Sequence, residues 1–212
     1  MENQEQHLKD LSEIKSLMQK SSRFLSLSGL SGVCAGFIAI AGAAFAFFYL
    51  NYDLRYFNPF EYFTKIYYSE FYSSTFILII DALIVLVLAL STGIFFTIRR
   101  AKRNKQSIWD NTTKRFLVNL ILPLGAGGIF CLILLYHKII FLLAPCTLIF
   151  YGLALLNASK FTLDDIKYLG ISEIILGLAA SFFIGYGLIF WAIGFGILHI
   201  VYGAVMYYKY EK

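Results

Sequence analysis

Charged side chains are scarce in this sequence: 15% of its 212 residues are charged, whereas 59% are hydrophobic. A soluble domain of this length needs more surface charge, so the composition excludes that class and indicates a membrane protein. Cysteine is also rare, and its three copies, Cys34, Cys131 and Cys146, all lie inside apolar runs. Their odd number and their placement do not fit a disulfide framework, so we expect them to be small core residues.

Motifs for catalysis or ligand binding are missing as well. The sequence has no His-Glu-x-x-His spacing for a metal, and the glycines of residues 125–128 lack the lysine and the preceding strand of a phosphate-binding loop. His137 and His199 are expected at different depths in the bilayer, which argues against a haem held between them. The sequence therefore predicts no catalytic residue, no metal and no cofactor, and it favours a protein that is not an enzyme.

The chain does contain a strongly basic connector, residues 99–115, which holds seven cations and one acid between two long apolar runs. A basic loop between membrane spans stays on the cytoplasmic side. The net charge of +5 therefore indicates lipid headgroups rather than nucleic acid as the partner. The residues expected to anchor the chain to headgroups are Arg99, Arg100, Lys102, Arg103 and Lys105.

Apolar runs long enough to cross about 30 Å of hydrocarbon recur along the chain. We expect an all-α membrane protein whose six transmembrane helices form three hairpins. The polar segment 1–25 has apolar residues at helical spacing, which predicts an amphipathic helix that lies on the membrane, leads into the first span or binds a partner. Residues 209–212 form a short tail. The predicted spans are 26–50, 74–98, 116–136, 139–157, 166–186 and 188–208.

The distribution of positive charge predicts how these spans are oriented. All but three of the 18 Lys and Arg residues fall on the side of the basic connector, and an even number of spans places both termini there too. We therefore expect a multi-pass protein of the bacterial inner membrane with both termini in the cytoplasm. On the opposite side, ten aromatic residues within 51–72 predict an aromatic belt or a ligand platform.

Matched details indicate that the hairpins are repeats in one orientation, which would be related by an axis along the membrane normal. Similar composition of glycine-rich apolar helices is the other explanation. Two ascending spans share a pair of glycines with the same separation, and the three returning spans share a glycine a few residues before a cation. These residues are Gly29 with Gly36, Gly170 with Gly177, and the dipeptides Thr92-Gly93, Tyr151-Gly152 and Tyr202-Gly203.

The last hairpin, from Leu169 to Gly203, resembles the repeats of the HdeD family of bacterial six-span acid-resistance membrane proteins. Residues 22–29 also resemble the entry to the first span in uncharacterised bacterial six-span proteins. These resemblances imply six spans and a bacterial membrane, and they supply no catalytic residue. The long polar N-terminal segment departs from the HdeD pattern. Mitochondrial carriers also have three hairpins, but their Pro-x-Asp/Glu-x-x-Lys/Arg signature is absent from this sequence.

Three ionisable residues, Asp81, Glu173 and His199, lie inside predicted spans. Glu173 and His199 each share a helix face with glycines, and helical rise places them at roughly 10 Å and 13 Å from the inner ends. Small faces attract each other, so we expect a Glu173–His199 pair that relays a proton, senses pH or simply links two spans. Asp81 is expected to face the bundle nearer the outer side, as a second proton or cation site or bound to polar groups there.

Two functions agree with these patterns. The first is a non-enzymatic inner-membrane protein that serves as a stress, regulatory or scaffold component. The second is a small proton- or cation-coupled transporter or channel that uses Asp81, Glu173 and His199. A transporter needs a polar cavity that joins these residues, whereas a scaffold needs only separate pairs. The expected partners are the bilayer and a protein at the N-terminal helix or the basic connector.

Overall fold

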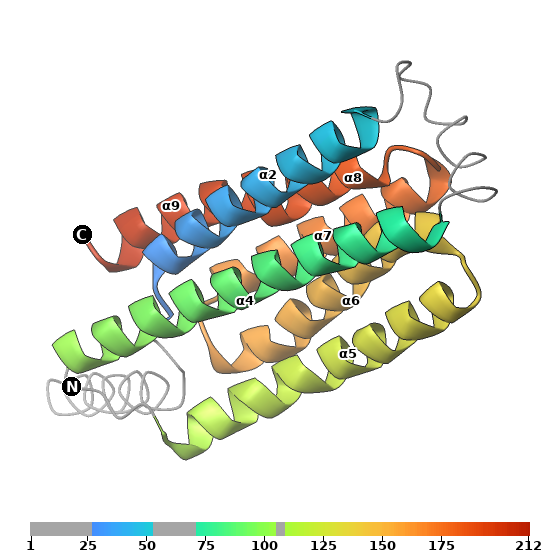
Figure 1. Ribbon diagram of the computed structural model, residues 1–212. Coiled ribbons are helices and arrows are strands. Elements are labelled where there is room, and N and C mark those ends of the chain that lie inside the picture. The colour runs from blue at the N-terminus through green and yellow to red at the C-terminus, as the bar shows by residue number, and fades with distance from the viewer. Residues whose placement is uncertain (1–26, 53–70, 105–108) are drawn as a thin grey trace, which may run out of the picture.

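The computed structural model describes residues 27–52, 71–104 and 109–212, which are almost entirely helical and contain no strand (Figure 1). The predicted helix 1–25, most of the aromatic segment 51–72 and Lys105 lie outside the described residues. Short 3-10 turns flank α6, and a π-helix, Ala192–Leu198, joins α8 to α9. The helices are α2 (Gly29–Tyr52), α4 (Phe71–Arg103), α5 (Asn111–Tyr136), α6 (Leu143–Ala158), α7 (Asp165–Phe182), α8 (Gly187–Trp191) and α9 (His199–Tyr210).

Five helical stretches are long and apolar enough to cross a membrane, and they coincide with five of the six predicted spans. The sixth predicted span, 166–186, coincides with α7. This helix has 18 residues and carries Asp165, Lys167 and Glu173, so it is shorter and less apolar than the others. The five candidate spans are Gly29–Leu50, Phe76–Arg103, Asn111–Tyr136, Ile140–Phe161 and Gly187–Tyr210.

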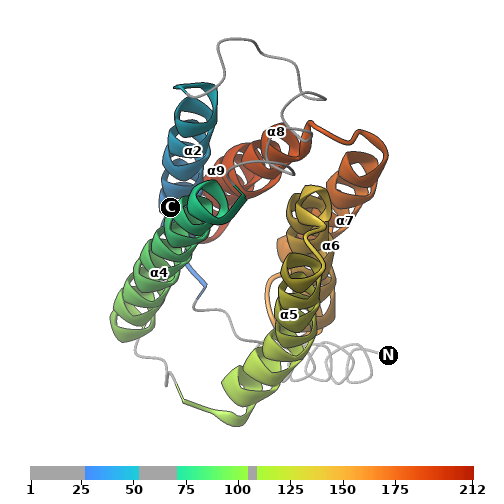
Figure 2. The same ribbon diagram turned by 45° about the vertical axis from the view of Figure 1, so that its right-hand side comes forward.

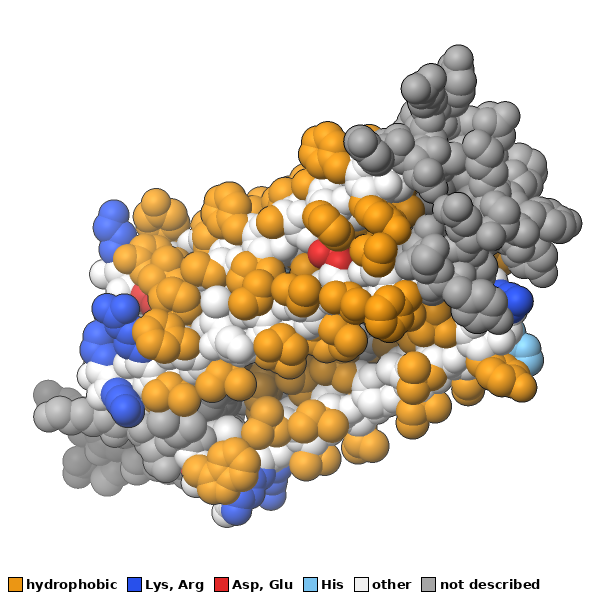
Figure 3. Space-filling model, viewed as in Figure 1, with side chains coloured by type: hydrophobic (Ala, Val, Ile, Leu, Met, Phe, Trp, Pro, Cys, Tyr) orange, Lys and Arg blue, Asp and Glu red, His pale blue; other side chains and the backbone are white. Residues whose placement is uncertain are grey.

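The helices run side by side (Figure 1), and hydrophobic side chains cover the middle of the bundle on the face that Figure 3 shows. Lys and Arg side chains gather at the end where α4 finishes and α5 begins, which we call the basic end. His137 and Lys138 form the turn after α5 at the opposite end. Such a distribution suits a bundle whose basic end meets lipid headgroups. The cations of α4 and α5 at the basic end are Arg99, Arg100, Lys102, Arg103, Lys114 and Arg115.

The helices form two groups, which are visible in Figure 2. In one group α2 packs against α9 and α4, and in the other α6 packs against α7 and α5. The α8–α9 segment also contacts α6 and α7, so it joins the groups. Near the basic end this junction has an apolar core made of Leu155, Leu163, Ile166, Leu169 and Met206.

Glycines let α2 and α9 approach closely. A Cβ atom on Gly36 would lie 2.6 Å from Cγ1 of Ile200, and one on Gly203 would lie 2.6 Å from the amide nitrogen of Val33. Neither distance leaves room for a side chain, so backbone lies directly against the neighbouring helix. Close approach of this kind is how helices associate where lipid removes the hydrophobic drive.

The α7–α6 pair meets at the corresponding residues. A Cβ atom on Gly177 would lie 2.6 Å from Cγ1 of Ile149, and one on Gly152 would lie 2.9 Å from the amide nitrogen of Ile174. Both pairs are antiparallel, and the glycines and isoleucines occupy matching positions in the sequence. Gly93, the third glycine of this kind, has no atom of the described residues within 4 Å of its Cβ position. The same helix crossing is therefore used twice.

Candidate functional site

Glu173 of α7 is the most deeply buried charged residue of the described part of the chain, with 0% exposure. Its Oε1 atom lies 3.5 Å from Nδ1 of His199, the first residue of α9. The structure thus brings together the two residues that the sequence pattern paired. No group of three or more possible metal-binding side chains occurs among the described residues.

The π-helix before α9 shapes this site through Gly194. The carbonyl oxygen of Gly194 accepts a hydrogen bond from Nδ1 of His199 over 2.9 Å. Gly194 also makes room for the carboxyl group, because a Cβ atom there would lie 2.5 Å from Oε2 of Glu173. Segments of π-helix are rare and occur frequently at functional sites. The irregular backbone therefore positions both members of the pair.

Tyr151 of α6 completes what we call the buried polar cluster, Glu173, His199 and Tyr151. Its hydroxyl oxygen lies 2.7 Å from Nε2 of His199. A carbonyl can only accept, so we assign the ring hydrogen to Nδ1, which faces Gly194. In a neutral imidazole, Nε2 then accepts a hydrogen bond from the Tyr151 hydroxyl. His199 is consequently held from two sides, and the cluster links α6, α7 and α9.

Aromatic rings keep the surroundings of the cluster apolar. The ring of Phe195 lies 5.0 Å from that of Tyr151 and 5.8 Å from that of His199, between ring centroids. Neither carboxyl oxygen of Glu173 has a hydrogen-bond partner among the described residues. A bare carboxylate in such surroundings costs several kcal/mol unless it is protonated or paired. The arrangement can therefore hold a proton on Glu173 or on His199.

Asp81 lies in a different helix interface, between α4 and α2. Both of its carboxyl oxygens are 3.6 Å from the position that a Cβ atom on Gly42 would take. The side chain of Asp81 is partly exposed, whereas Glu173 is enclosed by neighbours on α6 and α9. The two carboxyl groups therefore do not form one site.

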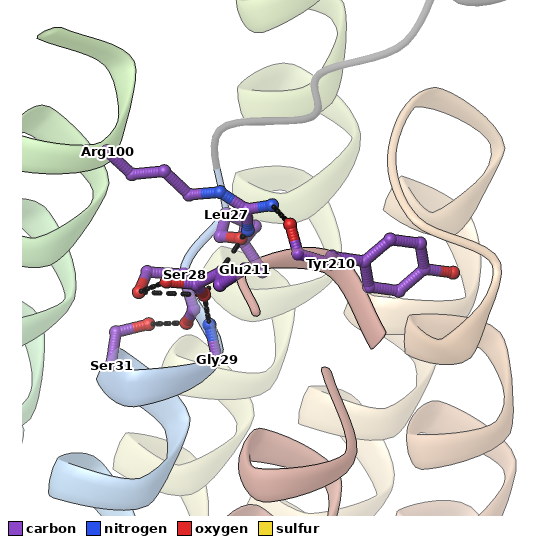
Figure 4. Close-up of polar contacts among 7 residues, drawn as sticks. All are labelled: Leu27, Ser28, Gly29, Ser31, Arg100, Tyr210 and Glu211. Carbon is purple, nitrogen blue, oxygen red and sulfur yellow. Dashed lines mark hydrogen bonds and ion pairs between the residues drawn. The ribbon is translucent and has the colours of Figure 1, made fainter. Parts of the chain in front are cut away.

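Arg100 was expected to face lipid headgroups, and the structure corrects this: Arg100 is only 7% exposed. Its Nη1 atom lies 3.4 Å from Oε1 of Glu211 and also donates to the carbonyl of Leu27. Figure 4 shows these residues around the Arg100 side chain. Nη2 donates to the carbonyl oxygen of Tyr210 over 3.0 Å. The side chain turns inward because these acceptors cluster where three helices end. Arg99, Lys102 and Arg103 are exposed, and their headgroup role stays a prediction.

Glu211 in turn binds the start of α2. Its carboxylate accepts hydrogen bonds from the Gly29 amide over 2.5 Å and from the Ser28 hydroxyl over 3.1 Å. A negative charge at this position satisfies free amides and suits the helix dipole. We call Arg100, Glu211, Ser28 and Gly29 the helix-end cluster. It ties together the ends of α2, α4 and α9.

Sequence reasoning missed Tyr151 and Glu211 as members of these clusters. Tyr151 carried a signal, since it precedes the repeated glycine of its span, but that signal indicated packing rather than a hydrogen bond. Glu211 is the single acid of the tail. Nothing in the local sequence shows that it pairs with a residue 111 positions away.

The described helices define the class of the protein. A helical bundle with five candidate spans, an apolar outer surface and polar clusters inside has the organisation of a multi-pass membrane protein. Comparison of the chain with known protein families, with curated proteins and with solved structures found no match.

Proposed function

We propose that this chain is a non-enzymatic integral protein of the bacterial inner membrane that serves as a stress, regulatory or scaffold component. One observation carries the proposal: the ionisable groups that lie between the described helices occupy separate interfaces. Asp81 lies between α2 and α4, Glu173 contacts His199, and Arg100 contacts Glu211. Separate contacts hold a bundle in one arrangement, whereas a transport path needs polar groups that are joined.

Six crossings with both termini in the cytoplasm belong to the same proposal. The position of α7 supports the sixth crossing, because α7 packs antiparallel along α6 and buries Glu173 against α9. The collection of cations at the basic end supports the orientation. The resemblance of the last hairpin to the HdeD repeats supports the stress assignment.

Proton- or cation-coupled transport is the second candidate, and one observation favours it. Glu173 is fully buried beside a π-helix, and among the described residues its carboxyl oxygens have no hydrogen-bond partner. Ionisable residues placed in this way inside a membrane mark ion paths in many transporters. In this reading, Glu173 and His199 exchange a proton during transport.

A flux measurement separates the two candidates. The purified protein is reconstituted in liposomes that contain a pH-sensitive dye, and proton, sodium and potassium gradients are imposed from acidic to mildly alkaline pH. We expect the ion flux into liposomes with the wild-type protein to equal the flux into empty liposomes. We expect Glu173→Gln to have the same circular dichroism spectrum as the wild type, because it keeps the fold. Flux in the wild type that Glu173→Gln abolishes would replace the scaffold proposal with transport.

A second experiment tests the stress assignment in cells. Deleting the gene should lower survival after an acid shock, and both the wild type and Glu173→Gln should restore survival. Equal survival with and without the gene would remove the stress assignment.

A further inference from the structure

Two of the three cysteines are in contact with each other. The Sγ atom of Cys131 on α5 lies 3.5 Å from the Sγ atom of Cys146 on α6, and both are free thiols. Cys146 is only 6% exposed, whereas Cys131 is partly exposed. Cys34 lies on α2, which packs against α9 and α4 instead. The thiol pair therefore belongs to the α5–α6 interface alone.

The side chain of Phe150 on α6 packs against Gly127 of α5 beside this pair. Gly127 lies one helical turn before Cys131, and Phe150 lies one turn after Cys146. A Cβ atom on Gly127 would lie 2.5 Å from Cγ of Phe150, so the two helices are in near contact at that level. A disulfide needs a sulfur separation of about 2.05 Å, so the thiols must approach by about 1.5 Å. Side-chain rotation supplies movements of this size.

We propose that Cys131 and Cys146 are a redox-active thiol pair, which a quinone dissolved in the bilayer oxidises to a disulfide between α5 and α6. Two S–H bonds break and one S–S bond forms. The two electrons and two protons pass to the quinone, which leaves as a quinol. The oxidant is a lipid-soluble one because the pair lies roughly 8 Å inside the end of α5, by helical rise from Tyr136.

Access to the pair comes from the lipid side of α5. Cys131 is itself partly exposed, and the residues that precede and follow it on the helix, Phe130 and Leu132, are 44% and 65% exposed. In a membrane such apolar surface faces acyl chains, where a quinone is dissolved. Cys131 is thus the thiol that meets the oxidant first, and the buried Cys146 is the thiol that closes the disulfide.

The test counts free thiols in the full-length protein, reduced and reconstituted in liposomes. A short-chain benzoquinone is added, excess quinone is removed, and the denatured protein is labelled with a maleimide and weighed by mass spectrometry. We expect labelling of the wild type to fall from three cysteines to one, with a peptide linked through Cys131 and Cys146. In the control variant Cys34→Ser, the number of maleimide labels per chain should fall from two to none. Cys131→Ser and Cys146→Ser should each keep both remaining labels.

Three results would overturn the proposal. The wild type keeps all its thiols, Cys34 is consumed in place of the pair, or the disulfide forms with a water-soluble azodicarboxamide oxidant but not with the quinone. If the buried position makes Cys146→Ser unstable, Cys131→Ser draws the same distinction at a partly exposed position.

Discussion

Arg100 of α4 and Glu211 at the end of α9 form an ion pair with 3.4 Å between Nη1 and Oε1, and their side chains are 7% and 5% exposed. The pair is surrounded by backbone groups of α2 and α9, which both side chains also bind. Three helix ends therefore depend on one contact between residues far apart in the chain.

Removing one partner of this pair should destabilise the bundle. Arg100→Ala leaves the Glu211 carboxylate buried without its cation, and breaking a buried pair in this way costs about 3–5 kcal/mol. The measurement is thermal or denaturant unfolding in detergent. Arg99→Ala is the matched control, because Arg99 is exposed and should change stability by about 0.5 kcal/mol or less. Equal losses in the two variants would contradict the buried role of Arg100.

The repeated helix crossing predicts opposite effects at two glycines. Gly203→Ala should lower stability, because the added Cβ atom would lie 2.6 Å from backbone of α2. Gly93→Ala should be neutral or raise stability by about 1 kcal/mol, since no atom of the described residues lies within 4 Å of its Cβ position and alanine favours helix. Unfolding curves in detergent give the stability of each variant relative to the wild type. A loss at Gly93 as large as that at Gly203 would show that α4 has a tightly packed neighbour at this level.

The hydrogen bond between Tyr151 and His199 can be tested with the two corresponding tyrosines. Tyr151→Phe leaves Nε2 of His199 without its donor, and an unsatisfied buried group costs about 1–3 kcal/mol. Tyr202→Phe is the matched control, because Tyr202 precedes the corresponding glycine of α9 and makes no hydrogen bond among the described residues. Both variants are compared by unfolding in detergent. If Tyr151→Phe were as stable as the wild type, the Tyr151 hydroxyl would not bind His199.

The hydrogen bonds that Asp110 accepts predict that the stability of the protein depends on pH. Its carboxylate accepts hydrogen bonds from the amide and hydroxyl of Thr113 at the start of α5. The hydrogen bond from the Thr113 amide has the larger effect, and together the two hydrogen bonds lower the pKa of Asp110 below its ordinary value of 3.8. A lowered pKa adds stability that is complete above the ordinary value and is lost as pH falls through the folded value.

The variant Asp110→Asn keeps a capping side chain but cannot titrate in this range. We therefore expect the wild type to lose more stability than Asp110→Asn when pH falls from about 6 to about 2, below the ordinary range of aspartate. Unfolding in detergent at several pH values gives the comparison. Parallel curves for the two proteins would show that the Asp110 carboxylate does not cap α5.

The positions of the apolar helices could be predicted from the sequence, because a span needs a long apolar run and the chain has few charges to interrupt one. Helix ends were harder to predict. The run that ends at Ile98 continues as helix through Arg103, since cations are good helix formers and favour helix C-termini. The π-helix Ala192–Leu198 could not be predicted, because its residues have no pattern that distinguishes it from α-helix.

The Glu173–His199 contact could be predicted from small-residue faces and depth. The third member, Tyr151, could not, because it depends on how α6 packs against α9. The same reason applies to Arg100. Its sequence context is that of any cation at the end of a span, and only the fold brings the Glu211 carboxylate to it.

The contact of α2 with α9 has a consequence for how the chain is made. Ser28 and Glu211, which meet at the basic end, are separated by 183 positions, so α2 emerges from the ribosome long before its partner. Until then the glycine face of α2 must be shielded by the insertion machinery or by lipid. Translation that stalls after α7 would therefore leave α2 in contact with α4 but without α9, and would expose its glycine face to membrane quality control.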